Sequence, residues 1–564
     1  MAGSAAERLL AELEDVRRLR PGATRAERLL EALVAVDLDD ARLLVRLHEA
    51  LLFLRAYPHS RAVLRGSEKL LRSFGARVRR LKASGADVAP LEEREVSGIA
   101  GTAIEMIFSF DFAKGLVARH PRSVSIDWDG YEGGERLGAA LPPFVPLLEE
   151  EALADANVPY PSWVDAARPS NERDASWLLS RLDHSPLTER EKADRYDALG
   201  LWLRWELGDG GATRTRMRRP APRPFFGDGP LLSRRDVSLD GELGGPRLLV
   251  RTLPAREGRV AIDLCQEAMG TRYRELYAFN YGDPSNVVSA DAGRGLELLV
   301  VGIRPERRLP LRAGFGTAFF RNGVPIGYGD AYAFFDRLDV AFNIFSAFRD
   351  GESAFVYARL LRLFRQLLGT STFSADPFQI GLGNDEALDS GAFWFYRKLG
   401  FHSSDPEIER AAFREEARAK AKPGHRTGRA ALERLAGASL LREAPGMPPA
   451  WDRFRLAKLI QRPARKMAAS GLDAEAWRAA AERRVAGAIG FRPAGASPEM
   501  LRAFRGLAPV LNLVSDLSSW AEGEKVALLE AIREKGGPRE QRFLAALGRL
   551  PRLRRALLRL GSVG

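Results

Sequence analysis

Hydrophobic positions in the first 95 residues recur every three or four residues. Three such sets stand out: Leu9, Leu10, Leu13 and Val16; then Leu29, Leu30, Leu33 and Val34; then Leu43, Leu44, Leu47, Leu51 and Leu52. Positions with this spacing share one face of an α-helix. Pro58 follows the third set and marks its end, because proline cannot continue a helix. The pattern predicts a mainly helical N-terminal region over residues 1–95, built of helical hairpins.

Residues 96–245 show a less regular pattern and are predicted to be mixed but mostly helical. The apolar run 99–116 predicts a buried helix, the alternation at 124–128 a strand, and residues 176–207 further helices. Residues 213–224 are basic, rich in proline and without periodicity, so we expect an exposed linker there. A strap that binds an anion over the following domain is the alternative.

Strand-like and helical patterns alternate from about residue 246. Residues 247–253 and 296–303 are predicted strands, and residues 261–279 are a predicted helix. This helix carries basic and aromatic side chains that either form a partly exposed amphipathic face or line a substrate site: Arg272, Tyr273, Arg274, Tyr277 and, just past its end, Tyr281.

Two strand-like runs meet at Asn322-Gly323. Both residues tolerate the positive φ angles of a type I′ turn, so the pair predicts a β-hairpin. A third run at 337–345 leads to a glycine-containing loop. Helical spacing then begins at Ala354 and ends at Gly369, and a short strand and another helix follow.

A glycine loop that joins a strand to a helix is suited to bind an anion. The first helical turn has N–H groups without an internal partner, and the helix dipole favours negative charge. Gly351 permits close approach of the backbone, and Ser353 and Ala354 are small. Plain loop geometry is the alternative interpretation of the same residues.

The order of elements and three short motifs resemble the GNAT superfamily of acyl-CoA-dependent N-acyltransferases. The resemblance covers about residues 316–401 and extends back toward Pro246. The motifs are Asn322-Gly-Val-Pro-Ile-Gly327, Phe348-Arg-Asp-Gly-Glu-Ser353 and Tyr396-Arg-Lys-Leu-Gly-Phe401. The resemblance implies an α/β (α+β) GNAT-like mixed-sheet domain at residues 246–405, flanked by mainly α-helical N- and C-terminal regions.

The same resemblance implies an acyl-CoA-dependent N-acyltransferase that takes acetyl-CoA or another acyl-CoA as co-substrate, uses no metal and acts on an amine. Tyr396 is the expected acid that protonates the departing sulfur. The residues expected to bind the thioester are Ile344, Phe345 and Ser346 for the acyl group, and Arg349, Gly351, Ser353, Ala354 and Asn384 for the rest of the CoA. Candidate bases, by residue type alone, are Asp330, Asp339 and Asp376.

The chain departs from the family pattern in the loop and before the tyrosine. Phe348 replaces the basic or amide residue that opens the pyrophosphate loop, with Arg349 one position later. Glu352 adds a carboxylate to the first helical turn, where we expect it to suit the dipole but to repel a phosphate. Asn384 lies twelve residues before Tyr396, instead of the usual seven or so. A catalytically inactive GNAT-like scaffold or interaction protein is therefore the alternative function.

All of the basic excess lies in the last third of the chain. Residues 401–564 contain 31 Lys and Arg against 18 Asp and Glu, whereas residues 1–400 contain 55 against 56. A basic, helical C-terminal region is predicted over residues 406–564, with helices at 407–422, 430–441, 451–470, 474–486 and 524–532. The positive charge of this region would attract an anionic partner, which could be a nucleic acid, a membrane surface or an acidic protein. An aminoacyl-tRNA-dependent transferase is a further alternative function.

The composition of the chain bears on three questions: disulfide bonds, metal ligands and membrane segments. The 564 residues include one cysteine, Cys265, which excludes an internal disulfide framework and suits a reducing compartment. The six histidines show no spacing typical of metal ligands. The sequence shows neither eighteen consecutive apolar residues nor a secretory segment, so we expect a cytoplasmic protein without a transmembrane segment.

Overall fold

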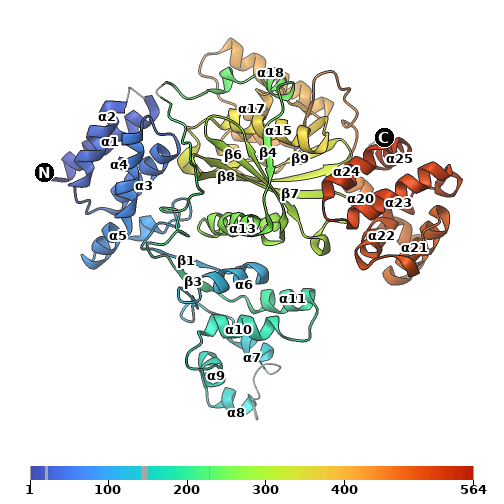
Figure 1. The fold of residues 1–564 in the computed structure, drawn as a ribbon, viewed down its shortest axis with the longest axis horizontal. Helices are drawn as coiled ribbons and strands as arrows, with labels where there is room; N and C mark the ends of the chain where they lie inside the picture. The colour runs from blue at the N-terminus through green and yellow to red at the C-terminus, as the bar shows by residue number, and fades with distance from the viewer. Residues whose placement is uncertain (1, 20–22, 142–149, 228, 563–564) are drawn as a thin grey trace.

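The chain is mixed α/β, in a computed structural model that describes residues 2–19, 23–141, 150–227 and 229–562. A large open sheet lies at the centre, with N-terminal helices on one side and C-terminal helices on the other (Figure 1). The N-terminal region is helical as predicted. Its helices are α1 (Ala2–Leu19), α2 (Ala23–Val34), α3 (Ala41–Ala56), α4 (Arg61–Arg72) and α5 (Phe74–Ala83).

A smaller α/β unit with its own core follows the N-terminal helices. Its three antiparallel strands lie in the order β1 (Ala103–Met106), β3 (Leu203–Glu206), β2 (Val124–Ile126). The helices are α6 (Phe110–Arg119), α7 (Gly134–Ala140), α8 (Glu150–Asp155), α9 (Tyr160–Ala167), α10 (Asp174–Asp183) and α11 (Glu189–Leu199). The helix predicted at 99–116 is wrong, because β1 occupies its first half. The helices predicted at 176–207 end before β3, whose Trp205 packs in the core.

The larger sheet has ten strands among the described residues. They are β4 (Leu249–Thr252), β5 (Gly282–Asp291), β6 (Leu296–Ile303), β7 (Ala313–Arg321), β8 (Val324–Phe334), β9 (Arg337–Val340), β10 (Asn343–Ile344), β11 (Thr372–Ala375), β12 (His402–Ser403) and β13 (Leu440–Glu443). The order across the sheet is β12-β13-β11-β9-β8-β7-β6-β5-β4, and β10 pairs with β8. Only the β9–β11 pair is parallel among these described strands.

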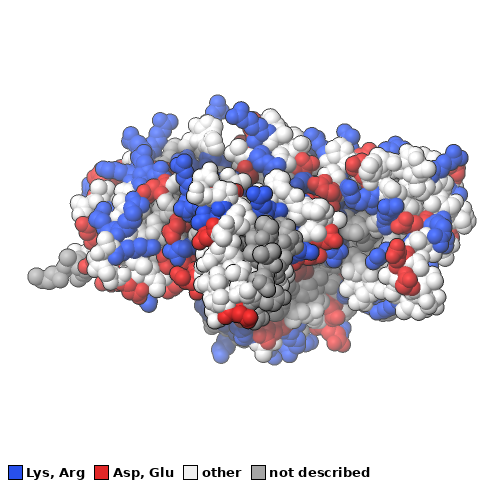
Figure 2. Space-filling model, turned by 90° about the horizontal axis from the view of Figure 1, so that it is seen from below, with Lys and Arg blue, Asp and Glu red and all other residues white. Residues whose placement is uncertain are grey.

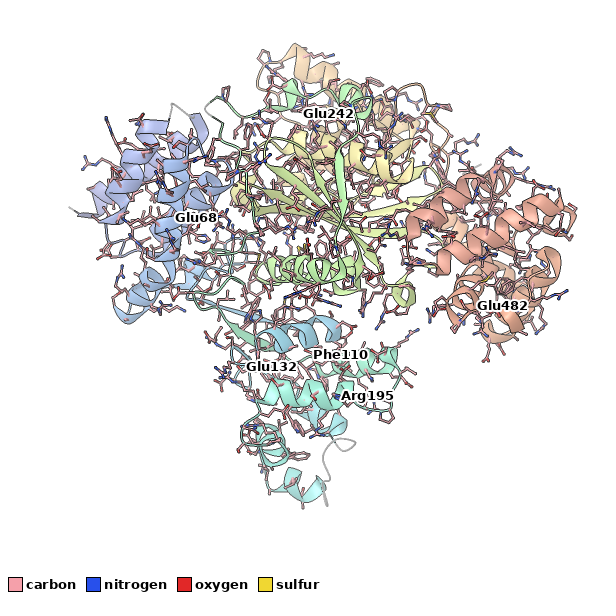
Figure 3. The ribbon with its side chains drawn as sticks, in the orientation of Figure 1. Glu68, Phe110, Glu132, Arg195, Glu242 and Glu482 are labelled. Carbon is pink, nitrogen blue, oxygen red and sulfur yellow. The ribbon has the colours of Figure 1, made fainter. Side chains whose placement is uncertain are left out.

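Helices cover both faces of this sheet. Figure 1 shows α13 (Ala255–Gly270) on one side and α15 (Ser353–Leu368) and α17 (Ala392–Arg397) on the other. The shorter helices are α12 (Leu239–Leu243), α14 (Tyr277–Asn280) and α16 (Asp385–Asp389). Glu242 of α12, labelled in Figure 3, pairs with Arg359 at 3.1 Å and Arg362 at 3.0 Å. These ion pairs hold α12 against α15.

The predicted hairpin is confirmed in its backbone angles. Asn322 and Gly323 have φ values of 50° and 80°, and they join β7 to β8. The Asn322 side-chain amide also donates hydrogen bonds to the carbonyl oxygens of Ala56 at 2.9 Å and Phe225 at 3.0 Å. The hairpin tip therefore touches the end of α3 in the N-terminal region.

The predicted linker at 213–224 is largely buried in its first part, residues 213–219, here called the strap, whereas residues 220–224 are partly to fully exposed. Thr213, Arg214 and Thr215 are each at most 2% exposed. Three of the strap arginines have acidic partners: the buried Arg214 pairs with Glu49 at 2.6 Å, and the half-buried Arg218 and Arg219 pair with Glu68 at 2.8 Å and Glu297 at 3.0 Å. Glu68, labelled in Figure 3, lies on α4, so the strap joins the N-terminal helices to β6.

The C-terminal third is mainly helical, as predicted, but it also completes the sheet. Its helices are α18 (Pro406–Ala421), α19 (Arg429–Leu435), α20 (Leu456–Ala468), α21 (Ala474–Ile489), α22 (Pro498–Leu511), α23 (Glu522–Gly536), α24 (Glu540–Gly548) and α25 (Pro551–Gly561). Strand β13 inserts between β11 and β12, so the sheet extends past the predicted boundary at 405 and the helix predicted at 430–441 ends early.

The last helices dock on the sheet through a buried ion pair. Lys535 and Glu540 are 4% and 1% exposed and pair with each other. Lys535 donates to the Arg312 carbonyl at 2.8 Å, and Glu540 accepts from the Gly314 N–H at 3.1 Å.

None of the described helices is long and apolar enough to cross a membrane. Basic and acidic side chains are interspersed over the described part of the face in Figure 2.

Candidate functional site

A cavity of about 660 Å³ opens beside β10. Its walls come from β10 and the turn after it, the start of α15, and helices α16 and α17. Seven of the nine residues predicted to form the site line it: Ile344, Phe345, Ser346, Arg349, Ser353, Asn384 and Tyr396. The structure thus brings together most of the residues that the family resemblance selects.

The cavity exists because the chain leaves the parallel strand pair. After β9, β10 turns to pair with β8, so the space beyond the carboxyl end of β11 is not filled by another strand. In open α/β sheets, ligands bind in such crevices at the carboxyl ends of strands. Gln379 spans this gap, since its side-chain amide donates to the Phe342 carbonyl at 2.9 Å and it lines the cavity.

The charged lining of the cavity is mostly basic. Four arginines and two glutamates contribute to it: Arg94, Arg272, Arg274, Arg349, Glu95 and Glu386. Glu386 accepts from Arg274 at 3.0 Å and from Arg349. Burial raises the pKa of Glu386, but the charges and hydrogen bonds of these two arginines outweigh it and hold that pKa below its usual value. The remaining basic excess suits an anionic ligand.

Arg272 and Phe345 form part of the cavity wall. The Arg272 guanidinium carbon lies 3.8 Å from the centroid of the Phe345 ring, a cation–π contact. Its Nη1 donates to the Ala268 carbonyl at 2.7 Å, whereas Nε has no hydrogen-bond partner among the described residues. Burial lowers the pKa of Arg272 well below its usual value. The negative charge of Glu49 opposes this shift, but Glu49 also pairs with Arg214, so an anion in the cavity would add a further countercharge for Arg272.

In the loop before α15, Ser353 faces the cavity and Gly351 does not, although both were expected to do so. Gly351 faces Tyr57 of the N-terminal region, and neither Gly351 nor Ala354 lines the cavity. Phe348, 1% exposed, packs inward. Ser353 does line the cavity. The backbone N–H groups of Ser353 and Ala354 have no acceptor among the described residues, as expected for a first helical turn.

Glu352 does not point its charge at the loop. It is fully buried and pairs with Arg294 at 2.6 Å and Arg321 at 2.9 Å, and it accepts from the Leu232 N–H at 3.1 Å. Burial raises the pKa of Glu352, but the hydrogen bond from Arg294 and the charge of Arg321 hold it below its usual value. The expected repulsion of a phosphate is therefore wrong, because two arginines neutralise this carboxylate.

Tyr396 combines a buried ring with an unsatisfied hydroxyl. The residue is 1% exposed and lines the cavity, and its hydroxyl finds no hydrogen-bond partner among the described residues. Its ring meets Tyr357 edge to face, with centroids 5.4 Å apart. Burial raises the pKa of Tyr396, so the phenol keeps its proton at neutral pH. The group can donate that proton to a ligand in the cavity.

The other predicted residues have structural partners or lie elsewhere. Asn384 begins α16, where its side chain accepts from the Ala387 N–H at 3.2 Å, so it is a helix cap at the cavity edge. None of the three candidate bases lines the cavity. Asp339 pairs with Arg312 and Arg337, and Asp376 accepts from the Gln379 N–H. Asp330 has a buried Oδ1 without a hydrogen-bond partner in the part of the chain that the structure describes.

Several cavity residues were not predicted as site residues. Arg272 and Arg274 belong to the set for which an exposed amphipathic face and a substrate site are the two predicted alternatives. Both line the cavity, whereas the tyrosines of that set, Tyr273, Tyr277 and Tyr281, do not. The hydroxyl of Tyr328 accepts from Arg274 at 2.6 Å. Arg94 comes from the N-terminal region, and no local pattern could place it here. The local sequence feature that could have indicated Arg272 and Arg274 is their position on either side of an aromatic residue, Tyr273.

No protein-family model, curated protein or solved structure matches this chain.

Proposed function

We propose that this protein is an acyl-CoA-dependent N-acyltransferase with a GNAT-like sheet domain, and that the cavity beside β10 holds the thioester. One observation carries the proposal. A single cavity is lined by the strand end Ile344–Ser346, by Ser353 at the start of α15, and by Tyr396. The resemblance assigns these three parts to the acyl group, the pyrophosphate and the acid.

The basic lining supports a role in binding the phosphates. Arg349 and Arg274 share Glu386, an exchangeable partner that is about half exposed. A phosphate that enters the cavity can replace Glu386 as the hydrogen-bond acceptor of these arginines, and the N–H groups of Ser353 and Ala354 can donate to it. Ser353, rather than Gly351, is the residue of the loop that we assign to this contact.

The transfer step needs few groups from the protein. The amine nitrogen bonds to the thioester carbonyl carbon as the carbon–sulfur bond breaks. Tyr396 gives its proton to the departing thiolate, and the proton released by the attacking amine restores the phenol. Burial keeps the Tyr396 phenol protonated at neutral pH but also makes it a weak acid, so its proton passes to sulfur as the phenol oxygen receives the proton of the amine.

A scaffold without CoA binding is the second candidate, and one observation favours it. The Tyr57 hydroxyl covers the backbone at Gly351, where the resemblance places a pyrophosphate contact. The N-terminal helices thus fill part of the loop that an acyltransferase would keep open. In this alternative the cavity binds another anion or none, and the protein acts through its surface.

Calorimetric titration with acetyl-CoA and with free CoA tests the proposal. We expect micromolar binding by the wild type and by Ser353→Ala, and binding at least about tenfold weaker in Ser353→Glu. A glutamate in the first helical turn suits the dipole, so Ser353→Glu is expected to keep the fold. A folded wild-type protein that binds neither compound would reject the acyltransferase and leave the scaffold. Release of free thiol in the presence of an amine panel would then identify the acceptor.

A further inference from the structure

Three side chains with metal-binding atoms meet at the edge of the large sheet, away from the cavity. They are His402 of β12, Glu443 at the end of β13, and Asp452 in the turn before α20. One ligand atom from each lies within 4.8 Å of the other two. The His402 Nε2 is 3.0 Å from a Glu443 oxygen and 4.0 Å from an Asp452 oxygen.

Each of the two carboxylates keeps one buried oxygen without a hydrogen-bond donor among the described residues. Glu443 is 8% exposed, and its Oε1 is buried without a hydrogen-bond partner among the described residues, as is the Oδ1 of Asp452. Arg455 lies close by but donates to the carbonyl oxygens of Asp452, Phe454 and Ser404 instead. Buried carboxylate oxygens without donors cost free energy unless a cation or a proton joins them.

The imidazole has a polar contact at each ring nitrogen. The Nδ1 of His402 lies 3.4 Å from the Ser403 carbonyl oxygen, and Nε2 lies 3.0 Å from the Glu443 Oε2, to which it donates when no ion is bound. An ion that displaces the Nε2 proton would bind Nε2 while an Nδ1 proton points at the Ser403 carbonyl. A ring nitrogen bonded to a backbone carbonyl is the usual second contact of a histidine that binds a metal.

The backbone holds the three residues in place from three separate segments. His402 pairs with Leu441 across β12 and β13, which fixes its height relative to Glu443. Trp451, fully buried, packs on Phe334 and Phe454 and fixes the turn that carries Asp452. The side chains of His402 and Asp452 are 30% and 37% exposed, so the site is open to an ion and to water from solvent.

We propose that His402, Glu443 and Asp452 bind one Zn²⁺ ion, with water as the remaining ligand. One imidazole and two carboxylates suit Zn²⁺ and related first-row ions, whereas Mg²⁺ and Ca²⁺ prefer oxygen donors alone. The ion would join β12 and β13 to the segment that starts the C-terminal helices. Its role is therefore to fasten the last helices to the sheet, independently of acyl transfer.

Titration of the full chain, stripped with a chelator, with Zn²⁺ tests this proposal. We expect one equivalent to bind, and each of His402→Gln, Glu443→Gln and Asp452→Asn to weaken binding by at least about tenfold. The matched control is Glu415→Gln. That residue forms a similar pair, 3.1 Å from His425, but belongs to no three-residue cluster of this kind in the described chain. Zn²⁺ affinity should be unchanged in this control.

Two further measurements separate metal loss from misfolding. Circular dichroism of the stripped wild type and variants shows whether each variant folds, and Asp452→Asn, at a half-exposed position, is expected to do so. Co²⁺ in place of Zn²⁺ should give visible absorption bands with the wild type and none with Asp452→Asn. No Zn²⁺ bound at micromolar concentration, or binding that all three folded variants retain, would overturn the site. Preference for Mn²⁺ over Zn²⁺ would overturn the choice of ion.

Discussion

The hydroxyl of Tyr57 lies 2.5 Å from the point that a β-carbon on Gly351 would occupy. Tyr57 directly follows α3, and Gly351 lies in the loop before α15, so the N-terminal helices close over this loop. The glycine is needed for this approach between two segments, not for a positive φ angle. The glycine at position 351 therefore has a structural explanation that does not require a bound phosphate.

Gly351→Ala is expected to destabilise the protein by about 1–3 kcal/mol, because the new methyl group overlaps Tyr57 and the Phe348 carbonyl. Tyr57→Leu in the same chain should recover part of this loss. Urea denaturation of the four proteins of the double-mutant cycle measures the coupling. Gly210→Ala is the control, since a methyl group there meets no atom within 4 Å. Additive effects of Gly351→Ala and Tyr57→Leu would contradict the contact.

Glu352→Gln is expected to cost about 3–5 kcal/mol, because it leaves Arg294 and the buried Arg321 without a countercharge. The folded pKa of Glu352 is held low, so its contribution to stability is present above the unfolded pKa near 4.3 and is lost as pH falls through the folded pKa. Thermal unfolding at pH 7 compares the variants. Glu386→Gln breaks exposed pairs and should cost less than about 1 kcal/mol; equal losses would count against the buried pair.

Tyr396→Phe separates catalysis from stability. We expect acyl transfer to fall by about 10²–10⁴-fold while CoA binding stays within a few-fold. The unfolding temperature should change little, because the Tyr396 hydroxyl lies near the Gln379 side chain but makes no hydrogen bond of good geometry among the described residues. Tyr357→Phe is the matched control: its hydroxyl is also buried and unpartnered, but Tyr357 does not line the cavity. Equal loss of transfer in both variants would remove Tyr396 from the mechanism.

Asp330 should make stability depend on pH. Burial raises its pKa to about 7, so between about pH 4 and pH 7 the folded protein binds a proton that the unfolded chain releases. The free energy of unfolding then falls as pH rises through this range. Asp330→Asn should remove that slope and be more stable at pH 8 by roughly 2 kcal/mol. Urea titrations at pH 5 and pH 8 measure the change in the free energy of unfolding, with Asp39→Asn, at an exposed position, as the control. If Asp330→Asn leaves the pH dependence unchanged, the raised pKa of Asp330 is contradicted.

The sequence predicted best what is decided locally. Asn322-Gly323 and the helix that ends at Gly369 depend on nearby residues, and both form as expected, with φ values of 50°, 80° and 69°. Strand β5 was missed because Asp283, Pro284 and Ser285 break its alternation, and it is held by β4 and β6. Strand β13 was also missed: the helix predicted at 430–441 runs into its first two residues, because the pairing with β11 and β12 that makes this segment a strand is not visible locally.

The burial of the strap and part of the cavity lining could not be predicted from the local sequence. Arginines in a proline-rich segment predict exposure, and only the distant Glu49, Glu68 and Glu297 make their burial possible. In the cavity, the motif-bearing residues were predicted by resemblance. Arg94 and Arg272 were not, because their role depends on the approach of segments far apart in the chain.

The hydrogen bond from Asn322 to Ala56 joins residues 266 positions apart and sets an order of events during synthesis. The helix α3 is synthesised before the hairpin, and Arg55 in its last turn also donates to the carbonyl oxygens of Thr215 and Met217. At 5–20 residues per second, the 266 positions between Ala56 and Asn322 take on the order of 10–50 s to synthesise. The hairpin therefore adds its contact to this end of α3 after the strap does.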